Sequence, residues 1–136
     1  MKKHILIVDD DSDILELLSF HLSKDYNVVC ANDGSEALVK INSNFDLIIL
    51  DVMMPVLNGF DVCKTIKKNP ETSNIPVIFL TAKNSTDDEY EGLNIGAFDY
   101  IVKPVSIKTL LLRVKNIIGN IDKVKAEKLI VSIFSY

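Results

Sequence analysis

Five short runs of apolar residues, rich in β-branched side chains, recur along the chain. Each run has the length of a β-strand. They occupy residues 5–8, 28–30, 47–50, 77–80 and 100–102. Because the runs are continuously apolar and do not alternate with polar residues, they favour strands that are covered on both faces of a sheet.

Between these runs the apolar spacing changes to three or four residues, the repeat of one helix face. This spacing occurs within 14–22, 37–41, 60–66, 90–97 and 110–121. Residues able to cap free helix amides stand at the start of three of these segments, at Ser12 or Asp13, Gly34-Ser35 and Ser106. Strand alternating with helix five times predicts a doubly wound α/β fold, in which right-handed crossovers join five parallel strands flanked by five helices.

The chain of 136 residues has the length of a single domain. Hydrophobic residues make up 48% and charged residues 25%, the mixture of a folded globular chain. The helical pattern weakens near Asn120, so we expect one domain over 1–120. Apolar residues within 129–134 should not stand bare in water. We therefore expect 121–136 either to extend the fifth helix into a dimer contact or to be the stump of a linker to an output domain.

Charge and cysteine content restrict the partners and the compartment. The net charge of -4 provides no overall positive field to hold nucleic acid or an anionic membrane, so we expect direct binding to neither. Cys30 and Cys63 have neither the spacing of a zinc site nor that of a disulfide framework. The first apolar run ends at Val8, short of the about 7 to 15 residues of a secretion signal, and we expect a cytoplasmic protein.

Polar residues follow four of the five predicted strands. In an open parallel sheet, ligands bind outside the carboxyl ends of the strands. The residues that follow these strands are Asp9-Asp10, Asp51, Thr81 and Lys103-Pro104. Each has an ordinary structural explanation when taken alone, such as a helix cap or a buried strand end. Together they would place three carboxylates at one edge, and grouped carboxylates repel one another unless a cation lies between them.

This set of groups suits phosphoryl transfer. Mg²⁺ fits a site with few protein ligands, because it is bound through one or two carboxylates together with waters and phosphate oxygens. A carboxylate near such an ion can attack phosphorus and form an aspartyl phosphate. We expect Asp51 to be this nucleophile because its strand is central. Asp9 and Asp10 would then hold the metal, while Lys103 and the Thr81 hydroxyl would contact phosphoryl oxygens.

The ordered motifs of the chain resemble the receiver domains of two-component response regulators, of which the chemotaxis regulator is the simplest member. The resemblance covers residues 3–120 and rests on the order and spacing of five separate segments. These are 5–10 (ILIVDD), 50–55 (LDVMMP), Asn58-Gly59, 80–82 (LTA) and 100–104 (YIVKP). We read Pro55 and Gly59 as loop-shaping residues, with Gly59 free to take a positive φ.

The resemblance implies a flavodoxin-like fold and a phosphoacceptor that assists its own phosphorylation and dephosphorylation without acting as an enzyme on other substrates. It implies that Asp51 accepts a phosphoryl group from a histidine kinase, a phosphotransfer protein or a small phosphodonor. It further implies a Mg²⁺ site, which Mn²⁺ can also fill, with ligands from the carboxylates of Asp10 and Asp51, the backbone carbonyl of Met53 and, mainly through water, Asp9.

The same resemblance assigns further roles. The backbone amide of Ala82 would face the phosphoryl group, and the Lys103-Pro104 bond would be cis. Thr81 and Tyr100 would form a switch, in which Thr81 moves toward the phosphoryl group and Tyr100 turns inward. The surface of the fourth helix, fifth strand and fifth helix would change, to control a partner, a homodimer or an output domain.

Other functions fit the residues less well. A phosphatase of the haloacid dehalogenase type needs a second acid two residues after its nucleophile, where this chain has Met53. A flavodoxin-like flavin binder would want a phosphate loop rich in Ser, Thr and Gly after the first strand, where residues 9–11 are all aspartate. A receiver-like domain without phosphorylation is disfavoured because the acids, Thr81 and Lys103 are all present.

Overall fold

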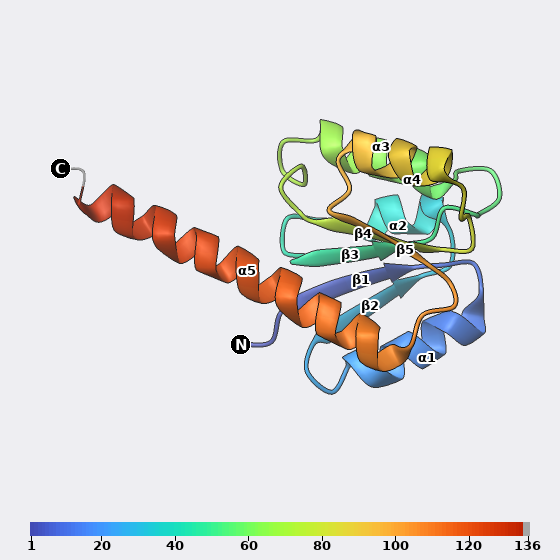
Figure 1. Ribbon diagram of the computed structural model, residues 1–136, viewed down its shortest axis with the longest axis horizontal. Coiled ribbons are helices and arrows are strands. Elements are labelled where there is room, and N and C mark those ends of the chain that lie inside the picture. Colours follow the sequence, from blue (N-terminus) through green and yellow to red (C-terminus); the bar gives the residue numbers. More distant parts are fainter. Residues whose placement is uncertain (135–136) are drawn as a thin grey trace. The chain divides into compact units, whose positions relative to one another are not determined.

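A computed structural model gives the fold and describes residues 1–134. Its five strands are β1 (His4–Val8), β2 (Asn27–Ala31), β3 (Leu47–Leu50), β4 (Val77–Thr81) and β5 (Asp99–Val102). They form one parallel sheet in the order β2-β1-β3-β4-β5 (Figure 1). The predicted parallel five-stranded sheet is thus confirmed, and each predicted strand lies within one residue of the observed bounds at either end.

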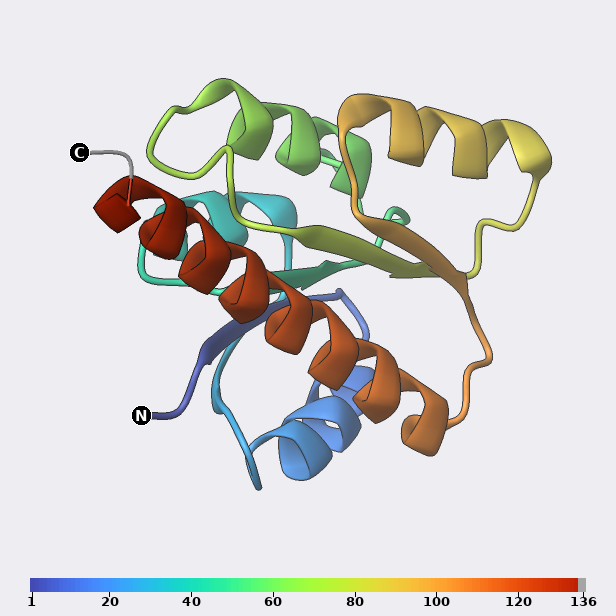
Figure 2. The same ribbon diagram turned by 60° about the vertical axis from the view of Figure 1, so that its left-hand side comes forward.

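Five helices alternate with the strands. They are α1 (Ser12–Leu22), α2 (Gly34–Lys40), α3 (Gly59–Lys68), α4 (Thr86–Ile95) and α5 (Ile107–Phe134). Helix α1 lies on one face of the sheet, and α2, α3 and α4 lie on the other, as Figures 1 and 2 show from two directions. The alternation of strand and helix predicted from the apolar spacing is therefore confirmed.

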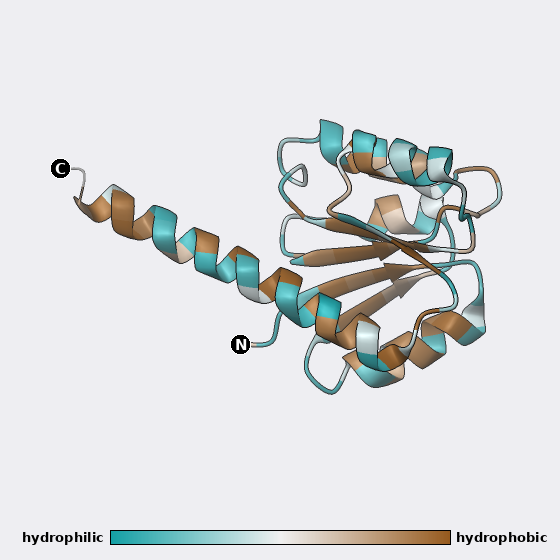
Figure 3. Ribbon diagram, viewed as in Figure 1, coloured by the Kyte–Doolittle hydropathy of each residue, from teal (hydrophilic) through white to brown (hydrophobic). Residues whose placement is uncertain are grey.

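The strands carry the core of the molecule. Every residue of β3 and β4 is buried, as are four of the five residues of β1. Figure 3 shows these strands in the colours of hydrophobic residues, with the helices carrying mixed faces. The continuous apolar character of the strands follows from their position, because a central parallel strand meets side chains on both faces.

The caps of α1 and α2 lie one residue before the positions predicted for them. Asp11 accepts a hydrogen bond from the amide of Asp13 at the start of α1, and Asp33 accepts one from the amide of Glu36 at the start of α2. Ser12 is the first residue of α1, so the prediction that Ser12 or Asp13 precedes and caps this helix is wrong, and Asp11 is the cap. The cap predicted at Ser106 is confirmed, since its Oγ accepts from the amide of Thr109.

Helix α4 packs on a side that the apolar spacing does not mark. Tyr90 and Leu93 are 70% and 42% exposed, whereas Gly92 is buried. A Cβ on Gly92 would lie 2.9 Å from the ring of Tyr100 and 3.1 Å from the ring of Phe79. The packed side of α4 therefore depends on a residue without a side chain, which a search for apolar residues cannot find.

The second compact unit of the chain begins at Ser106 and consists of α5, which is continuous through the predicted boundary at 120. Leu129, Ile130, Ile133 and Phe134 are all more than half exposed. Helix α5 continues through 121–134, a form that both a helical extension and a linker stump can take, and the last two residues of the range lie outside the described part. Within the described residues, no helix is long and apolar enough to cross a membrane.

Candidate functional site

Three carboxylates meet at the carboxyl edge of the sheet. Asp9 and Asp10 follow β1, and Asp51 follows β3, whose last residue pairs in register with the last residue of β1. The neighbouring strands thus deliver their acids to the same point. One oxygen from each of the three carboxylates lies within 4.8 Å of the others. The convergence predicted from the strand ends is therefore observed.

Two of these acids are buried and oriented by backbone amides. Asp9 and Asp51 are 3% and 5% exposed, whereas Asp10 is exposed. Oδ1 of Asp9 accepts a hydrogen bond from the amide of Asp11 at 2.9 Å. Oδ1 of Asp51 accepts one from the amide of Met53 at 3.2 Å. In both cases the second carboxylate oxygen is left for other partners.

Lys103 supplies the opposing positive charge. It follows β5, and its Nζ donates a hydrogen bond to Oδ2 of Asp9 at 2.7 Å while lying 3.6 Å from Oδ2 of Asp51. Burial raises the pKa of Asp9, and the charge of Asp51 adds to this, while the hydrogen bond from Lys103 acts in the opposite direction. The peptide bond between Lys103 and Pro104 is cis, as expected.

The donor set fits a hard divalent cation. The cluster offers carboxylate oxygens, and its three acids outnumber the single ammonium of Lys103 that pairs with it. Mg²⁺ and Ca²⁺ prefer oxygen ligands, and a site with few protein carboxylates suits Mg²⁺. The positive charge that grouped carboxylates require is thus only partly provided by the protein itself.

Thr81 and Tyr100 lie behind this edge and are linked through Lys83. Thr81 ends β4 and is fully buried, and its Oγ1 accepts a hydrogen bond from the amide of Lys83 at 3.2 Å. The hydroxyl of Tyr100 donates to the carbonyl of Lys83 at 2.7 Å, and its ring packs on Phe79 with a centroid distance of 5.7 Å. Burial, with nearby acids, raises the pKa of Tyr100 to about 12. Tyr100 is thus turned inward, with its hydroxyl satisfied.

In the loop after β3, Gly59 lies against the backbone of Asp51, and the positive φ predicted for this glycine is wrong. Among the described residues, a positive φ occurs at Gly96 and Val56 and not at Gly59. Gly59 is the first residue of α3, and its amide donates to the carbonyl of Val52 at 2.9 Å. A Cβ there would lie 2.1 Å from the carbonyl oxygen of Asp51. Glycine is required at this position because α3 begins against the backbone of Asp51.

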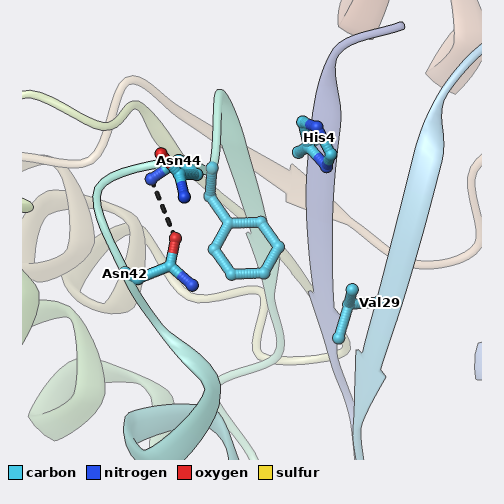
Figure 4. A pocket seen from close by; sticks show the side chains of 5 residues that line it. His4, Val29, Asn42 and Asn44 are labelled. Atoms are coloured by element: carbon cyan, nitrogen blue, oxygen red, sulfur yellow. Dashed lines mark hydrogen bonds between the residues drawn. The ribbon is translucent and has the colours of Figure 1, made fainter.

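Two hollows distinguish the two edges of the sheet. A cavity of about 410 Å³ lies beside the acidic cluster, with Asp10, Met53 and Lys83 among the residues that line it. A smaller hollow of about 260 Å³ lies at the amino edge, where His4 of β1 and Val29 of β2 face Asn42 and Asn44 (Figure 4). The residues that line the smaller hollow include no acid or lysine, whereas Asp10 and Lys83 are among those that line the larger one.

The fold and this edge combine an open parallel α/β sheet with an aspartate after a central strand, two further acids, a lysine after the last strand and a buried threonine. The family model described as the response regulator receiver domain matches residues 5–115. The chain therefore belongs to the response regulator receiver domain family of two-component systems. Receiver domains of this family act as signalling switches that interact with histidine kinases and bind Mg²⁺ at an acidic pocket.

Relatives and solved structures agree with this assignment. The transcriptional regulatory protein YrkP of Bacillus subtilis is 46% identical over 115 residues, 84% of this chain and 48% of the relative. The response regulator SaeR of Staphylococcus aureus is 37% identical over 121 residues, 88% of this chain and 52% of the relative. This chain thus spans about half the length of both relatives.

Among solved structures, a CheY-like receiver domain protein of Methanospirillum hungatei has a TM-score of 0.84 and 32% identity, covering 90% of this chain and 98% of the other. The BeF3-activated DrrB receiver domain has a TM-score of 0.79 and 35% identity, covering 88% and 99%. DrrB is a Thermotoga maritima protein. These likenesses include both sequence and fold.

Sequence reasoning missed the interactions of the loop between β4 and α4. The Nζ of Lys83 lies 3.3 Å from Oδ1 of Asp88 in the first turn of α4. Three acids, Asp87, Asp88 and Glu89, lie in the first turn of α4, where negative charge is favoured by the helix dipole. The signal that would have found the pair is the Ser85 cap three residues before Asp88, which fixes where that carboxylate points.

Proposed function

We propose that this domain is a phosphoacceptor signalling switch in which Asp51 receives a phosphoryl group from a histidine kinase or a phosphotransfer protein. The observation that carries the proposal is the meeting of Asp9, Asp10 and Asp51 around one point, with the ammonium of Lys103 opposite. A fold gains no stability from grouping acids in this way, so the arrangement points to a ligand that brings positive charge and a reaction that uses it.

The transfer forms one bond and breaks one. A carboxylate oxygen of Asp51 attacks phosphorus, and the bond from phosphorus to the donor imidazole nitrogen breaks, leaving its electron pair on that nitrogen. Asp10, Asp51, the carbonyl of Met53 and, through water, Asp9 would hold Mg²⁺ or Mn²⁺. The bound ion would neutralise charge on the phosphoryl oxygens.

The chain's own groups orient the acceptor and receive the new charge. The amide of Met53 holds Oδ1 of Asp51, so the other oxygen is directed away from the loop. We propose that Lys103 moves from Asp9 toward a phosphoryl oxygen, and that the Thr81 hydroxyl and the Ala82 amide donate to others. These groups act by position and charge, which supply most of the rate in phosphoryl transfer.

The switch would run through Thr81 and Tyr100. A phosphoryl group adds about -1.5 to -2 charge, enough to attract a hydroxyl donor. In this structure Tyr100 is already inward and hydrogen-bonded, so phosphorylation would stabilise this position instead of creating it. The predicted pairing of two copies through the surfaces of helix 4, strand 5 and helix 5, and the control of an output domain, remain part of this proposal. So does the cytoplasmic location.

The proposal treats the domain as a phosphoacceptor without turnover of other substrates. The position two residues after Asp51, where a dehalogenase-type phosphatase carries its general acid, holds Met53, whose thioether cannot transfer a proton. Its side chain is half exposed and lines the cavity beside the cluster. The domain therefore offers no second acid or base at that position.

The test is incubation with phosphoramidate and Mg²⁺ followed by intact-mass analysis. Wild type should gain the mass of one phosphoryl group, Asp51→Asn should gain none, and omission of the metal should abolish the gain. Asp25→Asn, which removes an exposed acid elsewhere, is the matched control and should behave as wild type. A mass gain that persists in Asp51→Asn would show that another residue is the acceptor.

A further inference from the structure

Lys83 is held at both of its backbone groups by the two switch residues. Its amide donates to Oγ1 of Thr81 at 3.2 Å, and its carbonyl accepts from the hydroxyl of Tyr100 at 2.7 Å. Its position is therefore tied to β4 and β5 at once. With the backbone engaged, the side chain is the part of Lys83 that can exchange partners.

The carboxylate of Asp88 holds that side chain toward α4. Nζ of Lys83 lies 3.3 Å from Oδ1 of Asp88. The other oxygen of Asp88 accepts from the Ser85 hydroxyl at 2.7 Å, and the Asp88 amide donates back to Ser85 Oγ at 3.0 Å. The hydrogen bond from Ser85, followed by that from Lys83, lowers the pKa of Asp88. Asp88 is thus a fixed, charged partner at neutral pH.

Lys83 is also one of the residues that line the cavity of about 410 Å³ beside the acidic cluster, together with Asp10 and Met53. It therefore lies between two places for its ammonium, one on Asp88 and one in the cavity. The side chain of Lys83 is 43% exposed, and exposed ion pairs are weak. A phosphoryl group on Asp51, with about -1.5 to -2 charge, would compete for the ammonium against the single charge of Asp88.

We propose that Asp88 is a positioning residue that sets the lifetime of the phosphoryl group by competing with it for the ammonium of Lys83. The proposal rests on the phosphorylation of Asp51 proposed above. In hydrolysis, the oxygen of a water molecule bonds to phosphorus, the bond from phosphorus to Asp51 breaks, and the carboxylate leaves with the electron pair. A proton of the water passes to solvent, and inorganic phosphate departs.

The position of the ammonium decides how readily this reaction proceeds. While Asp88 holds Lys83, the cavity beside the cluster stays open to water. When the ammonium turns to the phosphoryl group, it pairs with the charge of the phosphorylated state and its stem fills part of the cavity. Both effects slow hydrolysis, so weakening the hold of Asp88 should lengthen the lifetime.

The experiment loads the protein with phosphoramidate and Mg²⁺, removes the donor, and follows loss of the phosphoryl mass with time. Asp88→Asn should lengthen the lifetime by about two- to five-fold, the range expected for an exposed ion pair. The same substitution should have no effect in a Lys83→Met background. Asp88→Glu, which keeps the charge, should restore most of the wild-type rate. Asp87→Asn removes a neighbouring exposed acid and should decay as wild type.

Three results would overturn the proposal. They are an unchanged lifetime in Asp88→Asn, an equal change in the Lys83→Met background, and an equal change in Asp87→Asn. The second would assign the effect to helix capping, and the third to general surface charge. Failure of wild type to load at all would overturn the proposed function and this inference with it, whereas loading with equal decay would overturn the inference alone.

Discussion

Replacing Gly59 with alanine tests whether the start of α3 determines the position of the loop that follows Asp51. The new Cβ would lie 2.1 Å from the carbonyl oxygen of Asp51 and 2.8 Å from the Cα of Val52, where 3.0 Å is the practical minimum. Both neighbours are backbone atoms, so the loop or the helix must shift by close to 1 Å. Overpacking of this kind costs about 1–3 kcal/mol. The reduced freedom of the unfolded chain offsets about 0.4–1 kcal/mol of that.

We therefore expect Gly59→Ala to lower the free energy of unfolding by about 1–2 kcal/mol, measured by urea unfolding with an unchanged m-value. Its rate of phosphorylation should fall by up to about 10²-fold, since a displacement of about 1 Å can cost that much in a positioned reaction. Gly119→Ala is the control, because nothing lies within 4 Å of a Cβ there. In the α5 interior it should raise stability by about 0.5–1 kcal/mol. A Gly59→Ala variant as stable and as reactive as wild type would refute the reasoning.

Three further predictions follow from single residues. Val56 has φ 66° and a fully exposed side chain, so Val56→Gly should raise the free energy of unfolding by about 0.5–1 kcal/mol, and a loss of stability in urea would contradict the strain. The pKa of Tyr100 is raised from 10.0 to about 12, so its contribution to stability is complete below pH 10 and is lost as the pH rises toward 12. The stability difference between wild type and Tyr100→Phe should change over that window alone, and a constant difference in alkaline urea titrations would count against it. Asp33→Ala removes the cap that accepts from Glu36 at 2.7 Å and should cost about 1 kcal/mol, with Asp33→Ser close to wild type in the same assay.

The parts of the fold that repeat a simple pattern could be predicted from the sequence. The continuous runs marked all five strands, most clearly β1, β3 and β4, because a buried parallel strand has no polar face to interrupt it. The convergence of Asp9 and Asp51 followed from the topology alone, since neighbouring parallel strands end at the same edge. Residue roles such as the Ala82 amide and the Met53 carbonyl came from the resemblance and stay predictions.

Features that depend on close contacts between atoms could not be predicted from the sequence. The buried side of α4 is marked by Gly92, and the reason for Gly59 is a distance to a backbone atom, so neither carries an apolar or polar signal. Besides Gly96, a positive φ occurs at Val56, a β-branched residue for which this conformation is rare. The pairing of Lys83 with Asp88 depends on how a loop turns after β4, which residue spacing does not determine.

The ammonium of Lys103 is shared unevenly between Asp9 and Asp51, and this would affect the acceptor role proposed for Asp51. At 2.7 Å from Asp9 the ammonium is committed to a hydrogen bond, whereas at 3.6 Å from Asp51 it is beyond hydrogen-bonding length. A carboxylate oxygen that accepts a short hydrogen bond from an ammonium has a lone pair occupied, and it attacks phosphorus poorly. If Asp51 is the phosphoacceptor proposed above, Asp9 would hold the amine in the unphosphorylated state and leave the carboxylate of Asp51 free to attack phosphorus.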